Sequence, residues 1–137
     1  MTPAEATREG GLVVVLGGRR VALHLVDSIT EAIGRAGGAV AVSGSHGGVS
    51  AGRFALEAGV VLAVFNDAGV GRDGAGIAAL PLLQSRGVAA CTVAHSSARI
   101  GEARSTWHDG VVSHANDAAR ALGAREGLAL RAWLEPA

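Results

Sequence analysis

The stretch Ala39-Val40-Ala41-Val42-Ser43-Gly44-Ser45-His46-Gly47-Gly48 starts as an apolar run and ends in a polar turn lined by glycines. A short apolar run of this kind predicts a strand that is buried on both faces. Such strands are typical of parallel sheets that helices cover on both sides. The stretch therefore predicts an α/β fold with a polar turn at the carboxyl end of a central strand.

Two further apolar runs, 60–65 and 88–94, also end in polar loops, 66–76 and 95–99. Helical patterns separate the runs, so we expect parallel strands joined by right-handed crossovers. The carboxyl ends of parallel strands meet at one edge of the sheet, where ligands of α/β proteins bind. We therefore expect the three polar loops to form one small-molecule site.

The chain before this region predicts a β-hairpin. Leu12–Leu16 is apolar, Gly17-Gly18 favours a tight turn, and the alternation over 20–26 fits a second strand. Over seven residues the periods of strand and helix are hard to separate, so the start of a longer helix remains an alternative for 20–26.

Four helices are expected further along the chain, each followed by a glycine: 29–36, 50–58, 77–85 and about 110–121. Ser28 and Glu31 form a capping box before the first helix, and the second carries Phe54 on its buried face. Residues 95–107 are the longest irregular stretch. These elements predict one α/β domain over 1–137, a small three-layer sandwich with a mostly parallel sheet, a loose leader at 1–10 and a C-terminal packing segment at 124–137.

Composition excludes several classes of function. The 137 residues carry no formal net charge and only two Trp, two Phe and no Tyr, so a nucleic-acid site with a basic field and stacking rings is excluded. No apolar run approaches the ~20 residues of a membrane span. Hydrophobic residues make up 49% of the chain, which suggests that a second subunit covers part of the surface. We expect a cytoplasmic homo-oligomer.

Two residue types narrow the chemistry. All twelve basic residues are arginine, which excludes a Schiff-base lysine. The single cysteine, Cys91, lies in an apolar run, so we expect a buried side chain and no internal disulfide or cysteine metal cluster. His108 and His114 form no convincing metal triad with Asp109. The sequence therefore favours acid–base chemistry by His and Asp, with no metal and no cofactor.

Ser45 lies in the sequence Ser43-Gly44-Ser45-His46-Gly47, between a predicted strand and a predicted helix. This turn resembles the nucleophile elbow of α/β-hydrolases, although Ser43 replaces the first glycine. The resemblance implies Ser45 as the nucleophile, with Asp67 and His95 following in the order of that family. The alternative is that Ser43 and Ser45 satisfy the turn and cap the next helix.

His46 is a second candidate for the chemistry. Histidine exchanges protons near neutral pH, and neighbouring glycines leave the ring of His46 open to a ligand. Asp67 or Asp73 would orient this ring. The alternative is that His46 does not contact the ligand and only positions the residues that do.

The loop 66–76 contains four glycines, whose N–H groups suit a bound anion. Its spacing Gly69-x-Gly71-x-x-Gly74 matches the dinucleotide fingerprint. Asp73, however, occupies the position that the pyrophosphate would approach, and His95 stands where an acidic residue would bind the ribose. These two residues argue against a dinucleotide.

Arg99, with serines around it, predicts an anion clamp in the last loop, the alternative being a solvated arginine. In all, we expect the ligand to be bound by Asp27, Ser28, Ser43, Gly44, Gly47, Gly48, Asn66, Gly71, Asp73 and Arg99. The motifs Asp27-Ser28, Gly44-Ser45-His46-Gly47-Gly48 and Asn66-Asp67-Ala68-Gly69-x-Gly71-x-Asp73-Gly74-Ala75-Gly76 together resemble a family of small, uncharacterised bacterial α/β proteins. This resemblance spans most of the chain and implies no activity.

The leading hypothesis is an enzyme that acts on a small polar, anionic metabolite, most concretely a hydrolase of an ester, amide or lactone-like bond. Ser45 is then the nucleophile or positions the ligand, and His46 or His95 is the base. Asp67 orients the base and Arg99 holds the anion. One alternative is a lyase or isomerase that forms no covalent intermediate. Others are a metabolite-binding or regulatory subunit and a structural component of an oligomer.

Overall fold

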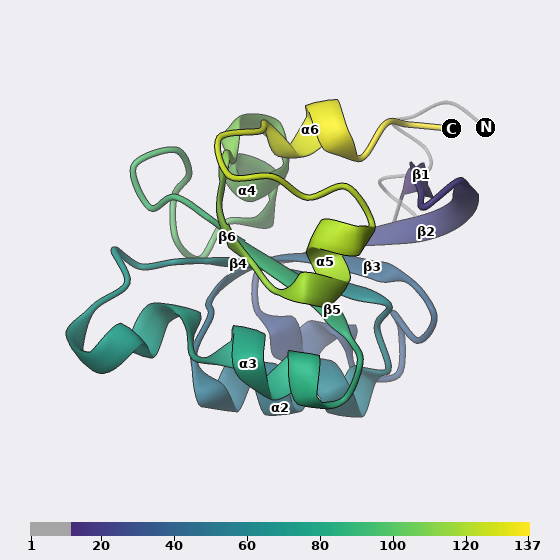
Figure 1. Ribbon diagram of the computed structural model, residues 1–137. Coiled ribbons are helices and arrows are strands. Elements are labelled where there is room, and N and C mark those ends of the chain that lie inside the picture. Colours follow the sequence, from purple (N-terminus) through teal and green to yellow (C-terminus); the bar gives the residue numbers. More distant parts are fainter. Residues whose placement is uncertain (1–11) are drawn as a thin grey trace.

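Six strands form one sheet in the computed structural model, which describes residues 12–137 (Figure 1). Their order across the sheet is their order in the chain: β1 (Leu12–Leu16), β2 (Arg19–Val26), β3 (Val40–His46), β4 (Leu62–Asn66), β5 (Ala89–Val93) and β6 (Val112–Ala115). β2 to β5 run parallel, while β1 and β6 are antiparallel to their neighbours. The predicted α/β class, the mostly parallel sheet and the N-terminal hairpin are confirmed. The leader expected at 1–10 lies outside the described residues.

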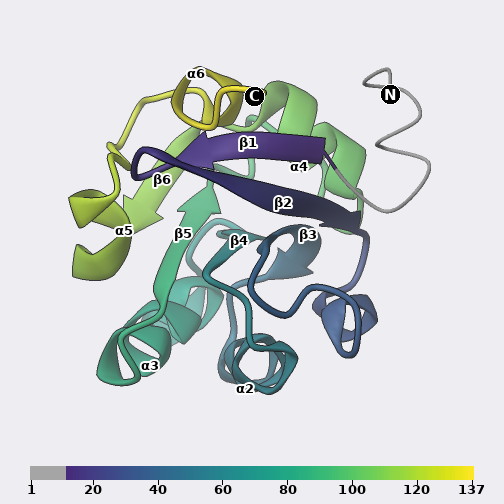
Figure 2. The same ribbon diagram turned by 90° about the vertical axis from the view of Figure 1, so that its right-hand side faces the viewer.

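Short helices cover both faces of the sheet and complete three layers (Figures 1 and 2). One face carries the 3₁₀ turn η1 (Ile29–Ala32) and the helices α2 (Val49–Ala58) and α3 (Ala79–Ser85). The opposite face carries α4 (Ala103–Asp109), α5 (Asp117–Ala121) and α6 (Leu130–Trp133). Because β2 to β5 are neighbours in chain order, right-handed crossovers between them place η1, α2 and α3 on the same side.

The two faces of the sheet bury side chains of different size. Toward α4, α5 and α6 the strands present branched residues such as Val42 and Val64. Toward α2 and α3 they present mainly alanine, such as Ala41 and Ala63, with Phe65 as the large exception. This alternation follows from the two-residue period of a strand. Small side chains on the second face let its helices lie close to the sheet.

Two of the four helix predictions are wrong. The helix expected over 29–36 is the single turn η1: the predicted capping box is present, but the helix ends at Ala32, and Gly34 adopts a positive φ of 77°. The helix expected over 110–121 is replaced by β6 and α5. Residues 112–115 pair with β5, and the Asn116 side chain caps α5 by accepting the Ala119 N–H at 3.0 Å.

Two local expectations need correction as well. The stretch expected to be irregular over 95–107 contains the start of α4. Phe54 is 38% exposed on α2, because Ala51, Ala55 and Ala58 form the buried face of that helix. The remaining helix, over 77–85, is α3 with Pro81 in its first turn, where the missing N–H costs no helical hydrogen bond.

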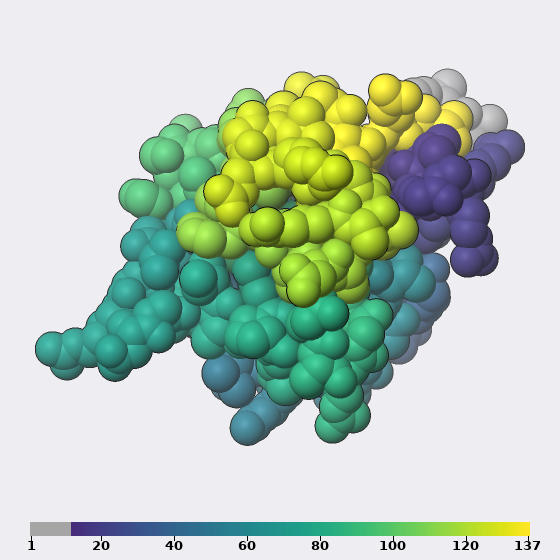
Figure 3. Space-filling view, viewed as in Figure 1, coloured from purple at the N-terminus to yellow at the C-terminus, as the bar shows by residue number. Residues whose placement is uncertain are grey.

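The segment between β4 and α3 projects from the body of the molecule (Figure 3). It contains the 3₁₀ turn η2 (Arg72–Ile77) and all three non-glycine residues with positive φ in the described chain: Ala68, Val70 and Asp73. A positive φ is rare for a β-branched residue, so Val70, with φ 70°, is strained.

The residues after α5 run along both edges of the sheet. Ala129 forms a bridge with Val111 next to β6, and Pro136 forms one with Val14 of β1. The Val15 N–H also donates to the Glu135 carbonyl at 2.9 Å. No helix within residues 12–137 has the length and apolar character needed to cross a membrane.

Candidate functional site

Backbone segments touch one another at the carboxyl edge of the sheet. The Gly44 carbonyl accepts the Gly101 N–H at 2.7 Å, and the Gly44 N–H donates to the Asp27 carbonyl at 3.1 Å. A Cβ at Gly44 would overlap the backbone of Gly101, and a Cβ at Gly47 would lie 2.6 Å from the Gly76 carbonyl oxygen. Gly44 and Gly47, both predicted to bind ligand, therefore serve the packing of one loop on another.

Asp67 and His95 meet at this edge because they follow the neighbouring parallel strands β4 and β5. The Asp67 Oδ1 atom lies 3.3 Å from His95 Nδ1, and it accepts the N–H groups of Gly69 at 2.8 Å and His95 at 3.0 Å. The Asp67 side chain is 6% exposed, whereas that of His95 is 61% exposed. A buried carboxylate thus holds an imidazole that faces solvent.

The environment of Asp67 favours its ionised form. Burial raises the pKa of this carboxyl, but hydrogen bonds from the N–H groups of Gly69 and His95, together with the nearby Ser113 hydroxyl and His95 ring, outweigh burial and hold the pKa below its ordinary value. The Ser113 hydroxyl also lies 2.9 Å from the hydroxyl of Thr92. Asp67 is therefore charged at neutral pH and lies beside Nδ1 of His95, whose Nε2 forms no hydrogen bond within residues 12–137.

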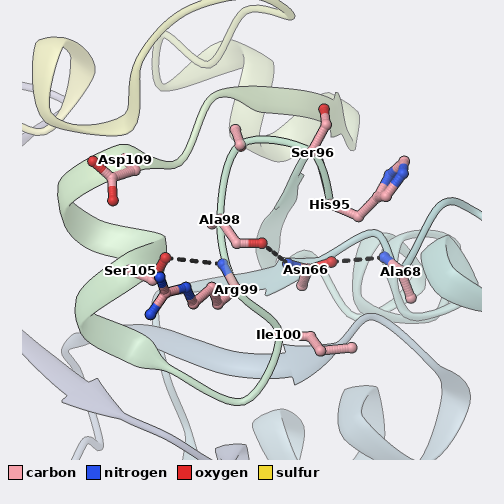
Figure 4. A pocket seen from close by; sticks show the side chains of 10 residues that line it. Asn66, Ala68, His95, Ser96, Ala98, Arg99, Ile100, Ser105 and Asp109 are labelled. Carbon is pink, nitrogen blue, oxygen red and sulfur yellow. Dashed lines mark hydrogen bonds between the residues drawn. The ribbon is translucent and has the colours of Figure 1, made fainter.

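A surface pocket of about 710 Å³ opens beside His95, between the loop after β5 and helix α4 (Figure 4). Its lining residues are Asn66, Ala68, His95, Ser96, Ser97, Ala98, Arg99, Ile100, Ser105 and Asp109. The buried Asn66 side chain ties two parts of the wall together, donating to the Ala98 carbonyl at 3.1 Å and accepting the Ala68 N–H at 2.8 Å. The volume suits a small metabolite.

Three of the predicted site residues therefore line this pocket: Asn66, His95 and Arg99. The Arg99 N–H donates to the Ser105 hydroxyl at 2.8 Å, which anchors the Arg99 backbone to α4. Within residues 12–137, neither the Arg99 guanidinium nor the Asp109 carboxylate forms a hydrogen bond or an ion pair. Both charges are exposed and available to a ligand.

Ser45 lies apart from the Asp67–His95 pair. It belongs to β3 and is not among the residues with positive φ, so it lacks the strained backbone of a nucleophile elbow. Its hydroxyl accepts the Ile29 N–H at 3.0 Å, on the side of β3 that faces β2. Among the described residues no hydrogen bond joins Ser45 to Asp67 or His95. The structure does not bring the predicted triad together.

Three polar residues predicted to bind ligand form hydrogen bonds within the protein. The buried Ser43 hydroxyl donates to the Val64 carbonyl at 2.8 Å. Ser28 caps η1. The Asp27 carboxylate accepts the Ala103 N–H at 2.9 Å and so fixes the start of α4. These side chains stabilise the edge on which the pocket is built.

The other predicted residues lie outside the pocket. His46 is the exposed last residue of β3 and pairs with Asn66 in register. Its ring stands beside Gly48, the N-cap residue of α2. Gly71 and Asp73 are exposed in the projecting segment shown in Figure 3. None of these residues except Asn66 lines the pocket beside His95.

Sequence reasoning missed Asp109 as a pocket residue. The expected helix began at about 110 and left Asp109 at or just before its start, whereas Asp109 ends α4. Ser105 and Asp109 are four residues apart in α4 and share one face of it. A helix predicted over 103–109 would have brought both side chains to the loop that carries Arg99.

Comparison of the chain with protein-family models, with curated proteins and with solved structures gives no match. Within residues 12–137, His, Cys, Asp and Glu side chains form no group of three that could hold a metal ion. The described site presents an imidazole with a carboxylate beside it and several polar groups.

Proposed function

We propose that the protein binds a small polar metabolite in the pocket beside His95 and transforms it by acid–base catalysis without a covalent intermediate. The 3.3 Å contact between Asp67 Oδ1 and His95 Nδ1 carries this proposal. An ionised carboxylate fixes the orientation of the imidazole and stabilises its protonated form. The same two groups serve a lyase, an isomerase or a hydrolase that activates water.

In this mechanism His95 accepts a proton at Nε2, either from the substrate or from a water molecule. Asp67 keeps its negative charge and stabilises the imidazolium that forms. His95 then returns the proton to the product or to the leaving group. Arg99 holds an anionic group of the substrate during both steps.

The test is turnover of a panel of small hydroxy, oxo and amino acids and their esters. We expect His95→Gln to lower kcat at least about 100-fold, which is typical for the loss of a general acid–base group. Ser45→Ala is the matched control and should leave kcat within a small factor of the wild-type value. Loss of activity in Ser45→Ala with an active His95→Gln variant would refute the proposal and favour a serine hydrolase.

A ligand-binding or regulatory subunit is the second candidate. The observation that favours it is the 61% exposure of the His95 side chain, since acid–base sites commonly exclude water when they close. Ligand binding without turnover across the panel, with equal affinity in wild type and His95→Gln, would support this candidate over the enzyme.

We also propose that the protein works in the cytoplasm as a homo-oligomer. Val13 and Val15 of β1 are 40% and 39% exposed, and this apolar surface supports contact with a second copy. Light scattering of the purified protein tests this point. A monomer at all concentrations would overturn it.

A further inference from the structure

The pocket points to a ligand class, and we infer that its ligand is a zwitterion, a compound that carries both a carboxylate and a protonated amine. This inference rests on the proposed function, in which the pocket holds the substrate. It sharpens the expectation of an anionic metabolite, because the pocket also presents a free negative charge. The two charged groups involved are the Arg99 guanidinium and the Asp109 carboxylate.

Helix α4 brings these two residues to the same side of the pocket. The hydrogen bond from the Arg99 N–H to the Ser105 hydroxyl places Arg99 beside one turn of α4. Asp109 lies one turn beyond Ser105 on the same face of α4, and the Cβ atoms of residues so placed are about 6 Å apart. Figure 4 shows Arg99, Ser105 and Asp109 together on the α4 side of the pocket, with His95 on the opposite side.

Each charge selects one end of the ligand. A guanidinium binds a carboxylate through two parallel hydrogen bonds, while a carboxylate such as Asp109 accepts them from an ammonium group. A dianion held by Arg99 would place its second charge close to Asp109, and like charges brought together cost affinity. A ligand with one charge of each sign satisfies both residues.

The rest of the pocket suits the carbon chain of such a compound. Ile100 is 54% exposed, and with Ala68 and Ala98 it offers apolar surface along the lining. The ligand then lies between the charges of Arg99 and Asp109 on one side and the ring of His95 on the other. This position brings its carbon chain or its substituents toward the group that exchanges protons.

Titration calorimetry of the full chain with five related probes tests the inference. Three probes are α-, β- and γ-aminobutyrate, which carry the amine on successive carbons of butyrate. The other two are butyrate and butylamine, which each lack one of the two charged groups. We expect at least one aminobutyrate to bind about ten-fold more tightly than butyrate and butylamine, because each charged hydrogen bond contributes to affinity.

Two variants assign the contacts. Asp109→Asn should bind the preferred aminobutyrate no better than butyrate, while Arg99→Gln should weaken every probe that has a carboxylate. Arg104→Gln and Glu102→Gln are the matched controls, because both residues are exposed on or next to α4 and neither lines this pocket. Both control variants should bind like the wild type.

Three results would overturn the inference of a zwitterionic ligand. These are equal affinity for butyrate and all aminobutyrates, a preference for aminobutyrate over butyrate that persists in Asp109→Asn, and no binding of any probe at millimolar concentration. The proposed function fails differently. If aminobutyrates bind through Arg99 and Asp109 but His95→Gln leaves turnover unchanged, the acid–base mechanism is wrong and the ligand class stands. If His95→Gln abolishes turnover of a substrate without an amine, only the ligand class is wrong.

Discussion

Gly44→Ala should strongly destabilise the protein. The added methyl group would overlap the backbone of Gly101 and Glu102, so β3 and the loop 99–102 must separate. Overpacking of this kind costs about 1–3 kcal/mol, and loss of the 2.7 Å hydrogen bond from the Gly101 N–H to the Gly44 carbonyl adds about 1 kcal/mol. We expect the free energy of unfolding to fall by about 3 kcal/mol.

Gly48→Ala is the matched control four residues away. Its φ of −82° suits any residue, and the nearest atoms belong to the ring of the exposed His46, at 2.9 Å. This ring can rotate away, so the cost should stay near 1 kcal/mol or below, the typical penalty for alanine in place of glycine at an N-cap.

Urea unfolding, followed by tryptophan fluorescence and circular dichroism, compares the two variants. Trp107 is 4% exposed in α4, directly after the loop that would move, and so reports on this region. Equal m-values are needed for the midpoints to measure stability. If Gly44→Ala unfolds at the same urea concentration as Gly48→Ala, backbone packing does not explain the glycine at 44, and close approach of a ligand becomes the better reason.

Three further changes test other parts of the structure. Asp67→Asn should cost about 2 kcal/mol at pH 7, because a buried carboxylate loses its charged hydrogen bonds. Because the pKa of Asp67 is lowered in the folded protein, its contribution to stability is complete at neutral pH and is lost as the pH falls through the folded pKa. The free energies of unfolding of the wild type and Asp67→Asn should therefore converge in urea titrations at acid pH. Val70→Gly should leave Tm unchanged or raise it, because relief of about 1–2 kcal/mol of left-handed strain offsets the entropy cost of glycine; a clear fall in Tm would contradict the strain. Asn116→Ala should lower the free energy of unfolding by about 3 kcal/mol, since its buried side chain bonds Ala90, Leu80, Val88 and Ala119, and a loss below about 1 kcal/mol would refute this role.

The central sheet was predictable from sequence because its strands are buried on both faces. Such strands appear as continuous apolar runs, and residues that directly follow neighbouring parallel strands come together whatever the details of packing. Asp67 and His95 are close for this reason alone. The direction of a side chain near a strand end is harder to predict. Residues 43–47 were expected to form a turn after the strand, but β3 continues to His46 through an irregularity in its pairing with β4. Ser45 therefore belongs to the strand and contacts Ile29.

The elements that complete the pocket depend on contacts between distant parts of the chain. Helix α4 has no strong apolar period in its sequence, and its first N–H group is bound by the carboxylate of Asp27, 76 residues away. Strand β6 forms because β5 offers an edge for pairing. Local patterns favoured a helix over 110–121 and an irregular stretch before it. Tertiary contacts override such preferences, and this is why the wall that carries Ser105 and Asp109 was not predicted.

The glycine-rich motifs that first suggested a ligand site are explained largely by the backbone. A Cβ at Gly44 or Gly47 would collide with the main chain of another loop, and one at Gly76 would collide with the main chain of Asp67 in its own loop, so these positions would need glycine even if no ligand were ever bound. Their glycines are therefore weak evidence for function, whereas no contact within residues 12–137 depends on the charges of Arg99 and Asp109. His95, Arg99 and Asp109 are exposed, and the last two have no partner among residues 12–137. If the site acts on a small molecule, substitutions at these three side chains should change binding or turnover while leaving stability nearly unchanged, and substitutions at the three glycines should do the reverse.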